Sequence, residues 1–155
     1  MTRLRQLTPD EIADAIADSA GEWAPELVFS RLCEAVAVAQ VSVKYPGPSS
    51  KMVATLEIEP SKPEDDPDLK TRRKAATPAQ ISRMEETLQW MSCHVKCKKA
   101  RAMLAQLARV RAIGGNYRAI CKRRGWGKSQ AYEICNVNLR AIAGALNRGK
   151  VPVRL

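Results

Sequence analysis

The chain has 155 residues, a formal net charge of +10 and an isoelectric point of about 9.7, so it is long enough for one domain or two very small ones. Apolar residues make up 45% of the chain but aromatic residues only 5%, so the core must consist mainly of Ala, Leu, Ile and Val, which favours helices. The composition therefore predicts an all-α protein. No apolar run reaches the roughly 18 residues of a membrane span, and no apolar segment typical of a secretory signal follows Arg3 and Arg5. We therefore expect a cytoplasmic protein.

The charge is unevenly distributed between the two halves of the chain. Residues 1–76 contain 10 Lys and Arg and 13 Asp and Glu, whereas residues 77–155 contain 16 and 3. Such asymmetry is typical of a nucleic-acid-binding half joined to a half with another role. A solvated basic surface without any partner would have the same charge count.

The first 41 residues predict two helices joined by a short turn. Thr8, Pro9 and Glu11 have the spacing of a capping box with a proline start, and Gly21 ends this first short helix. A second helix is predicted over 24–40, where apolar residues recur at helical spacing. Its amphipathic stripe consists of Val28, Leu32, Ala35, Val36 and Ala39. We therefore expect residues 1–41 to form an N-terminal helical hairpin that contacts a partner or a second copy of the chain.

Residues 42–76 have a different composition and contain five of the nine prolines of the chain. The stretch from Glu57 to Asp68 is acidic and broken by proline, which is typical of loops and linkers. A basic run over 70–74 precedes the next predicted helix. Such runs are usually solvated, although one beside a DNA-binding unit can touch phosphates. We therefore predict a Pro-rich acidic linker over 42–76.

Residues 77–155 are predicted to form a basic DNA-binding domain that begins with two helices. Thr77 and Pro78 start the first helix, and the second runs from about Lys98 to Arg111 before a stop at Gly114. The buried faces should consist of Ile81, Met84, Leu88 and Met91 in the first helix, and of Ala100, Met103, Leu104, Leu107 and Ala108 in the second. The residues of the second helix that should point outward are Lys98, Lys99, Arg101, Arg109 and Arg111.

A helix-turn-helix unit is predicted over 117–147. A short helix from Tyr117 to Arg124 meets Gly125, which allows the positive φ of a tight turn. Trp126 would fill the space between the helices, and Gly127 would be the N-cap of a longer helix that begins at Lys128. The buried stripe of this longer helix should consist of Ala131, Cys135, Asn138 or Leu139, Ile142 and Leu146. An ordinary helical hairpin that closes a bundle is the alternative interpretation.

The opposite face of the longer helix is polar in its first turns, as expected of a helix that lies in the major groove of DNA. Gln and Asn side chains pair with adenine edges, Lys with guanine and Glu with cytosine. We expect base contacts from Lys128, Ser129, Gln130, Tyr132, Glu133 and Asn136. We expect phosphate contacts from Lys99, Arg118, Lys122, Arg123, Arg124 and Arg140.

The same segment resembles the helix-turn-helix of sigma-factor region four, in which an Ile-Ala pair, a Leu-Gly-Ile-Ser turn and a Thr-Val pair follow one another. The corresponding positions are Ile120-Cys121, Gly125-Trp126-Gly127 and Gln130-Ala131. Arg124 stands where that pattern has Leu, and Gly127 stands where it has a capping Ser worth about 0.5–1 kcal/mol.

The order of segments over 23–147 also resembles an uncharacterised family of helical proteins from phages and prophages. Two motifs outside the helix-turn-helix carry this resemblance. They are the opening with Trp23, Pro25, Glu26 and Val28, and the helix with Pro78, Ile81, Arg83, Met84, Leu88 and Trp90. The resemblance implies an all-helical DNA-binding protein.

Catalytic and metal-binding sites are not predicted. Cys93, His94 and Cys97 are zinc-ligand types, but a structural zinc site needs four ligands, usually in tighter pairs. His94 is the only histidine, and the basic half has few carboxylates for acid–base work. No Gly-rich phosphate loop follows a predicted strand. We therefore expect no enzyme activity, no cofactor and no small-molecule substrate.

The leading functional prediction is sequence-selective binding of double-stranded DNA, as in a transcription regulator of phage or prophage type. A homodimer would favour a two-fold symmetric DNA site. One alternative is the small subunit of a phage terminase, a DNA-packaging protein in which an oligomeric ring carries helix-turn-helix units. Another is a protein adaptor of the transcription machinery, in which the acidic segment 57–68 contacts a basic partner, for example on RNA polymerase.

Overall fold

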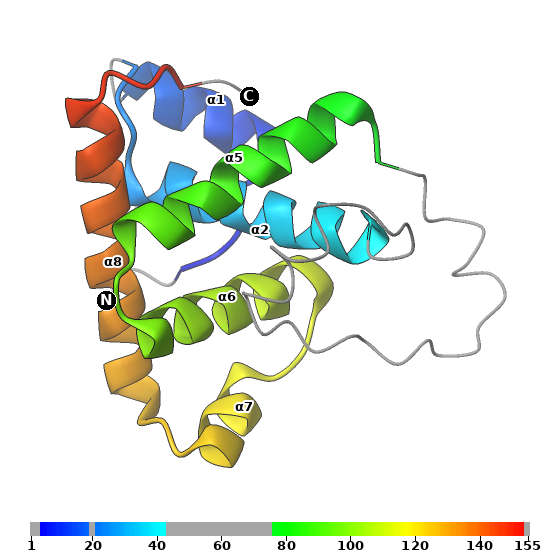
Figure 1. Cartoon of the computed structure of the whole chain (residues 1–155), viewed down its shortest axis with the longest axis vertical. Helices are drawn as coiled ribbons and strands as arrows, with labels where there is room; N and C mark the ends of the chain where they lie inside the picture. The colour runs from blue at the N-terminus through cyan, green and yellow to red at the C-terminus, as the bar shows by residue number, and fades with distance from the viewer. Residues whose placement is uncertain (1–3, 19–20, 43–75, 154–155) are drawn as a thin grey trace, which may run out of the picture.

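The computed structural model describes residues 4–18, 21–42 and 76–153, and all regular structure in these ranges is helical, as predicted (Figure 1). The predicted linker over 42–76 lies almost entirely outside the described residues. Among the described helices, none is long and apolar enough to cross a membrane. The helices are α1 (Pro9–Asp18), α2 (Pro25–Ser42), α5 (Pro78–His94), α6 (Lys98–Ile113), α7 (Tyr117–Arg124) and α8 (Lys128–Arg148).

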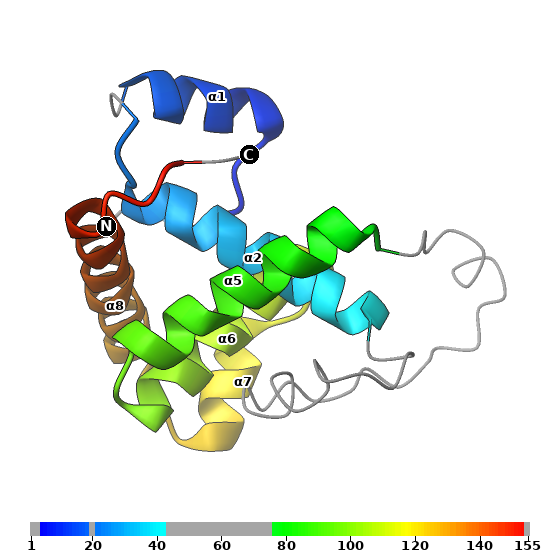
Figure 2. The same cartoon turned by 45° about the horizontal axis from the view of Figure 1, so that its top comes forward.

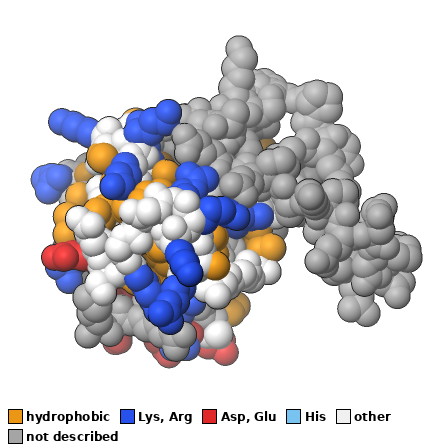
Figure 3. Space-filling view, turned by 90° about the horizontal axis from the view of Figure 1, so that it is seen from below, with side chains coloured by type: hydrophobic (Ala, Val, Ile, Leu, Met, Phe, Trp, Pro, Cys, Tyr) orange, Lys and Arg blue, Asp and Glu red, His pale blue; other side chains and the backbone are white. Residues whose placement is uncertain are grey.

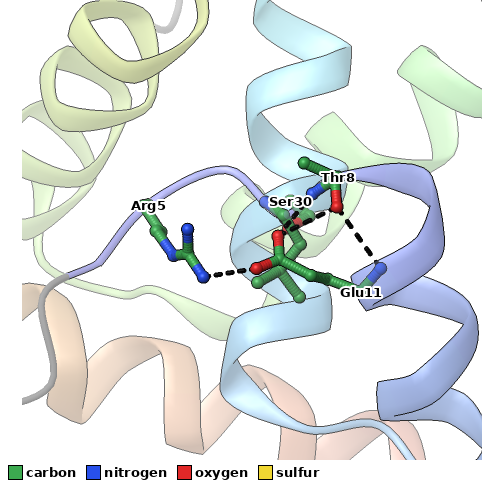
Figure 4. Close-up of polar contacts among 5 residues, drawn as sticks. Arg5, Thr8, Glu11 and Ser30 are labelled. Carbon is green, nitrogen blue, oxygen red and sulfur yellow. Dashed lines mark hydrogen bonds and ion pairs between the residues drawn. The ribbon is translucent and has the colours of Figure 1, made fainter.

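Both helix starts predicted from a threonine followed by proline are confirmed. At α5, Thr77 Oγ1 accepts a hydrogen bond from Gln80 N at 3.3 Å, and Gln80 Oε1 accepts one from Thr77 N at 2.9 Å. At α1, Thr8 Oγ1 accepts from Glu11 N at 3.4 Å, while the Glu11 carboxylate accepts from Thr8 N at 2.9 Å (Figure 4). These reciprocal bonds satisfy backbone donors that the first turn of a helix leaves unpaired.

The capping box of α1 has a consequence for the titration of Glu11. The hydrogen bonds from the Thr8 backbone and hydroxyl, with the nearby Arg5 guanidinium, lower the pKa of the Glu11 carboxyl below its ordinary value. A carboxyl with a lowered folded pKa stabilises the fold above its unfolded pKa, and this contribution disappears as the pH falls through the folded pKa. We expect an NMR titration to show this lowered pKa, and Thr8→Ala to raise it. An unchanged Glu11 pKa in Thr8→Ala would contradict this explanation.

Helix α2 lies at the centre of the bundle and packs against α5, α6 and α8 (Figures 1 and 2). The predicted amphipathic stripe is buried, but so are the residues between its members, including Phe29, Ser30, Arg31 and Cys33. The prediction of an amphipathic helix was therefore wrong for the first half of α2. The physical reason is that neighbours surround this part of the helix, so hardly any of its surface remains for solvent.

Helix α6 also differs from the prediction of one apolar and one basic face. Its predicted apolar residues are all buried, and Ala102, Ala105, Gln106 and Val110 are buried with them. Lys98 and Lys99 are exposed as predicted, whereas Arg101, Arg109 and Arg111 are half-buried. Arginine can occupy half-buried positions because its aliphatic stem packs on apolar neighbours. Arg111 also donates a hydrogen bond from Nη2 to Tyr132 Oη of α8 at 3.2 Å.

A single hydrophobic core joins α2 to α5, α6, α7 and α8. The helices assigned from sequence to segments 1–41 and 77–155 thus share one core, although the role proposed for each segment stays a prediction. Trp23 is part of this core, where its ring packs edge-on against Trp90 at 5.0 Å between ring centroids. Such aromatic pairs stabilise by about 0.5–1.5 kcal/mol beyond their buried area.

The end of α8 is fastened to the start of α2 by Asn147. Its side-chain Oδ1 accepts a hydrogen bond from Trp23 N at 2.7 Å, and its Nδ2 donates to Trp23 O at 3.0 Å. The Trp23 indole N–H donates to Val151 O at 3.0 Å. These three bonds fix the carboxyl end of α8 and the residues that follow it against the N-terminal half of the chain.

Candidate nucleic-acid interface

The turn between α7 and α8 has the geometry that its glycine predicts. Gly125 has φ +70° and ψ 28°, a left-handed conformation that costs residues with a Cβ about 1–2 kcal/mol. Its N–H donates to Lys122 O at 3.3 Å, and Trp126 N donates to Cys121 O at 2.8 Å. This bond pattern closes the end of α7 and lets the chain enter α8 after only three residues.

Buried apolar side chains pack α8 against the rest of the molecule. Ala131, Cys135 and Leu139 are completely buried, so Leu139 rather than Asn138 belongs to the predicted stripe. Burial raises the pKa of the Cys135 thiol to about 12. Cys135 is therefore a neutral core residue at neutral pH, which agrees with its interpretation as a small apolar residue.

Helix α7 is anchored by two polar contacts that the sequence analysis missed. Asn116 is its N-cap, with Oδ1 accepting a hydrogen bond from Ala119 N at 3.3 Å. The hydroxyl of Tyr117 donates to Met103 O of α6 at 3.2 Å. Asparagine directly before a helix is a recognisable capping signal, so the position of Asn116 before the predicted helix start at Tyr117 could have identified this cap.

Four of the predicted base-contacting residues lie on the exposed surface of the first turns of α8. They are Lys128, Ser129, Gln130 and Glu133. The other two, Tyr132 and Asn136, are half-buried. Tyr132 Oη accepts a hydrogen bond from Arg111 Nη2 at 3.2 Å, and its ring packs edge-on against Tyr117 at 5.4 Å. Tyr132 is thus engaged with α6 and α7 rather than grouped with the four exposed residues.

The predicted phosphate-contacting residues come from three helices. Arg118, Lys122 and Arg123 are exposed on α7, Lys99 is exposed in the first turn of α6, and Arg140 is exposed on α8. Arg124 is half-buried, with its guanidinium 5.4 Å from the centre of the Trp126 ring. Figure 3 views the end of the molecule that carries α7 and the start of α8, and Lys and Arg side chains spread over it.

The charge of this surface follows from the sequence around it. Residues 87–132, which include α6, α7 and the first five residues of α8, contain no Asp or Glu. They contain eleven Lys and Arg residues. Glu133 is the next acidic residue along the chain, and it is exposed beside Gln130 on α8. The surface is therefore strongly positive with one carboxylate, which favours a polyanion as its partner.

An exposed apolar side chain on the same helix was not predicted from sequence. Val137 is 56% exposed, one helical turn after Glu133 on the outer surface of α8. An exposed aliphatic residue next to polar ones suits contact with the methyl group of thymine. The sequence signal was present, since Val137 falls outside the buried stripe, but one valine between polar residues carries little information.

Helices α6 and α8 begin without a side-chain cap. Their N-cap residues are Cys97 and Gly127, and neither provides a side-chain hydrogen bond to the first turn. Backbone N–H groups in an uncapped first turn are suited to bind a phosphate oxygen, and the helix dipole favours negative charge there. At the start of α6, the backbone N–H groups of Ala100 and Lys99 lie near the exposed Cys97 thiol and, with nearby cations, lower its pKa, so a phosphate there would compete with the thiolate form of Cys97.

The described residues contain no group of three or more Cys, His, Asp or Glu side chains placed to hold a metal ion. Cys93 and Cys97 are exposed thiols, while Cys33, Cys121 and Cys135 are buried.

Comparisons with protein-family models, with curated proteins and with solved structures found no significant match for this chain. The exposed, positively charged surface of α7 and α8 is therefore the feature that points to a function.

Proposed function

We propose that the chain is a sequence-selective double-stranded DNA-binding protein that places the first turns of α8 in the major groove. The observation that carries this proposal is the exposure of Lys128, Ser129, Gln130 and Glu133 beside the exposed cations of α7. A helix fits the major groove, and its hydrogen-bonding side chains reach base edges there. A transcription regulator of phage or prophage type is the role that this activity and the sequence resemblances suggest.

Glu133 supports base-specific contact over purely electrostatic binding. Its carboxylate lies on a surface that is otherwise positive, where it would be repelled by the phosphates of the backbone. A carboxylate at a protein–DNA interface is favourable where it accepts a hydrogen bond from the cytosine amino group. We therefore assign Glu133 to a base edge, with Gln130 and Lys128 on neighbouring bases.

The uncapped start of α8 also fits this arrangement. Gly127 costs the isolated helix some stability because a serine would satisfy its first N–H groups. In a complex, a backbone phosphate would take the place of the missing cap and fix the depth of the helix in the groove.

Binding to duplexes selected from a random pool tests the proposal directly. We expect affinity to fall steeply between low and moderate salt, because each phosphate contact releases counterions. Lys128→Ala should mainly reduce the discrimination between selected and altered sites, by about 1–3 kcal/mol. Lys99→Ala should weaken all duplexes by a similar factor, because Lys99 is assigned to a phosphate.

Absent binding, or binding that is insensitive to salt, would overturn the proposal.

Native mass spectrometry separates the regulatory role from DNA packaging. One or two copies per particle agree with a regulator, whereas a ring of many copies would favour the terminase small subunit.

A further inference from the structure

The outer face of α8 carries an exposed aliphatic side chain between two exposed charged residues. Glu133, Val137 and Arg140 follow one another at spacings of four and three residues, so they lie on one face of the helix, opposite the buried stripe that contains Leu139. Val137 is 56% exposed, and the other large apolar side chain exposed in the described part of the chain is Ile113 at the end of α6. Val137 is therefore an apolar exception on a hydrophilic surface.

Val137 lies between a residue assigned to a base and a residue assigned to a phosphate. Glu133 has the base assignment, and Arg140 is the predicted phosphate contact farthest along α8. A helix rises about 1.5 Å per residue, which places Val137 about 6 Å beyond Glu133 and about 4.5 Å before Arg140. Figure 1 shows α8 as a continuous helix along one edge of the molecule, so a duplex that contacts both charged residues also passes Val137.

The apolar surface around Val137 is too small for a protein partner. Among its exposed neighbours on the same face, Glu133 and Arg140 are charged, and only Ala141 is apolar. Stable protein interfaces bury about 800 Å² per partner around an apolar centre. One valine and one alanine instead provide a surface that suits a single small apolar group.

The base edges in the major groove carry one apolar substituent, the C5 methyl group of thymine. Their other distinguishing groups are hydrogen-bond donors and acceptors. An aliphatic side chain would remove such a group from water without replacing its hydrogen bond, which is unfavourable. Contact between valine and a methyl group buries apolar surface on both sides and has no such cost. The chemistry of Val137 therefore favours a base with a methyl group at C5.

We propose that Val137 is a specificity-determining residue that contacts the C5 methyl group of a 5-methylpyrimidine, which is thymine in unmodified DNA. Successive bases are about 3.4 Å apart along the duplex, so this thymine lies within about two base pairs of the base that Glu133 contacts. The inference rests on the proposed DNA-binding function and adds the identity of one base to it. It also means that methylation of a cytosine at the same position raises the affinity.

Replacement of single thymines by deoxyuridine tests the inference in a duplex selected from a random pool. Uracil has the same hydrogen-bonding groups as thymine and lacks only the C5 methyl group. We expect one thymine at which this replacement lowers the affinity about three- to tenfold, because one methyl group is no longer buried. It should lie within about two base pairs of the position at which Glu133→Ala relaxes the selected sequence. Fluorescence anisotropy measures each affinity.

Cytosine and 5-methylcytosine at the same position separate the methyl contact from hydrogen bonding. Both bases have an amino group where thymine has the O4 acceptor, and they differ from each other only in the methyl group. The duplex with 5-methylcytosine should therefore bind about three- to tenfold more tightly than the duplex with cytosine.

Val137→Ala and Ile113→Ala provide a matched pair of variants. In Val137→Ala, both methyl effects should fall below about twofold, because the two methyl groups that make the contact are removed. Ile113→Ala truncates the other exposed aliphatic side chain, which is 45% exposed and lies outside α8, and it should keep both effects.

The outcomes separate this inference from the proposed function. Salt-sensitive, sequence-selective binding that no deoxyuridine replacement weakens would overturn the inference and leave the DNA-binding proposal standing. Methyl effects that persist in Val137→Ala would do the same. So would a loss of self-association in Val137→Ala without a change in the methyl effects, which would assign Val137 to a contact between copies of the chain. Absence of binding to every duplex would overturn both proposals.

Discussion

Replacing Arg118 and Lys122 together by glutamate is expected to lower the affinity for duplex DNA about 100-fold at moderate salt. Both side chains are exposed one turn apart on α7, next to the start of α8. Each lost phosphate contact removes about 0.9 from the slope of log affinity against log salt, so the double variant should have a slope about 2 units shallower. Fluorescence anisotropy at several salt concentrations measures both quantities.

The control for this variant is Arg148→Glu with Lys150→Glu. These residues are exposed at the opposite end of α8, and their reversal changes the net charge by the same amount. The control should lose much less affinity, because exposed charges separated by more than about 10 Å interact weakly at moderate salt. Equal losses in both variants would mean that overall charge, rather than the surface around α7, determines binding.

Leu139→Ala is expected to lower the free energy of unfolding by about 2–5 kcal/mol, as in other buried leucine truncations. Leu139 is completely buried on the inner face of α8, between Cys135 and Ile142 in the stripe that faces the core. The loss combines the transfer free energy of the removed atoms with the cost of the space they leave. Urea denaturation followed by circular dichroism measures the change.

Val137→Ala is the matched control on the same helix. Val137 is 56% exposed, so its truncation should change the free energy of unfolding by no more than about 0.5 kcal/mol. A loss of less than about 1 kcal/mol in Leu139→Ala would show that α8 is not packed as described. The two variants also distinguish the core role of Leu139 from the surface role of Val137, since Val137→Ala should affect DNA recognition more than the free energy of unfolding.

Local signals in the sequence were sufficient to predict the helices. Threonine followed by proline located the starts of α1 and α5, and Gly125 located the turn before α8. These features act through bonds within a few residues, so no knowledge of the rest of the fold is needed. For the candidate site, helical periodicity predicted the exposure of four of the six base-contacting candidates on α8, namely Lys128, Ser129, Gln130 and Glu133.

Contacts between distant parts of the chain could not be predicted in this way. The burial of Arg31 and Phe29 depends on helices that come much later in the sequence, and hydrophobic spacing along α2 does not reveal them. Asn147 forms a hydrogen bond with Trp23, which is 124 positions away in the sequence. Nothing in the sequence around an asparagine near a helix end indicates so distant a partner. Likewise, periodicity placed Tyr132 on the polar side of α8, but only the position of Arg111 shows that its hydroxyl is already engaged.

The central position of α2 has a consequence for how the protein is made. The helices that make its main contacts, α5, α6 and α8, all follow it in the chain. At roughly 5–20 residues per second, a ribosome completes α8 about 5–20 s after α2, whereas helical domains fold within about a millisecond. During this interval the nascent chain carries an apolar helix whose packing partners have not been synthesised. Folding is therefore expected to wait until α8 has been synthesised, and chaperones that shield apolar segments can bind the nascent chain before then.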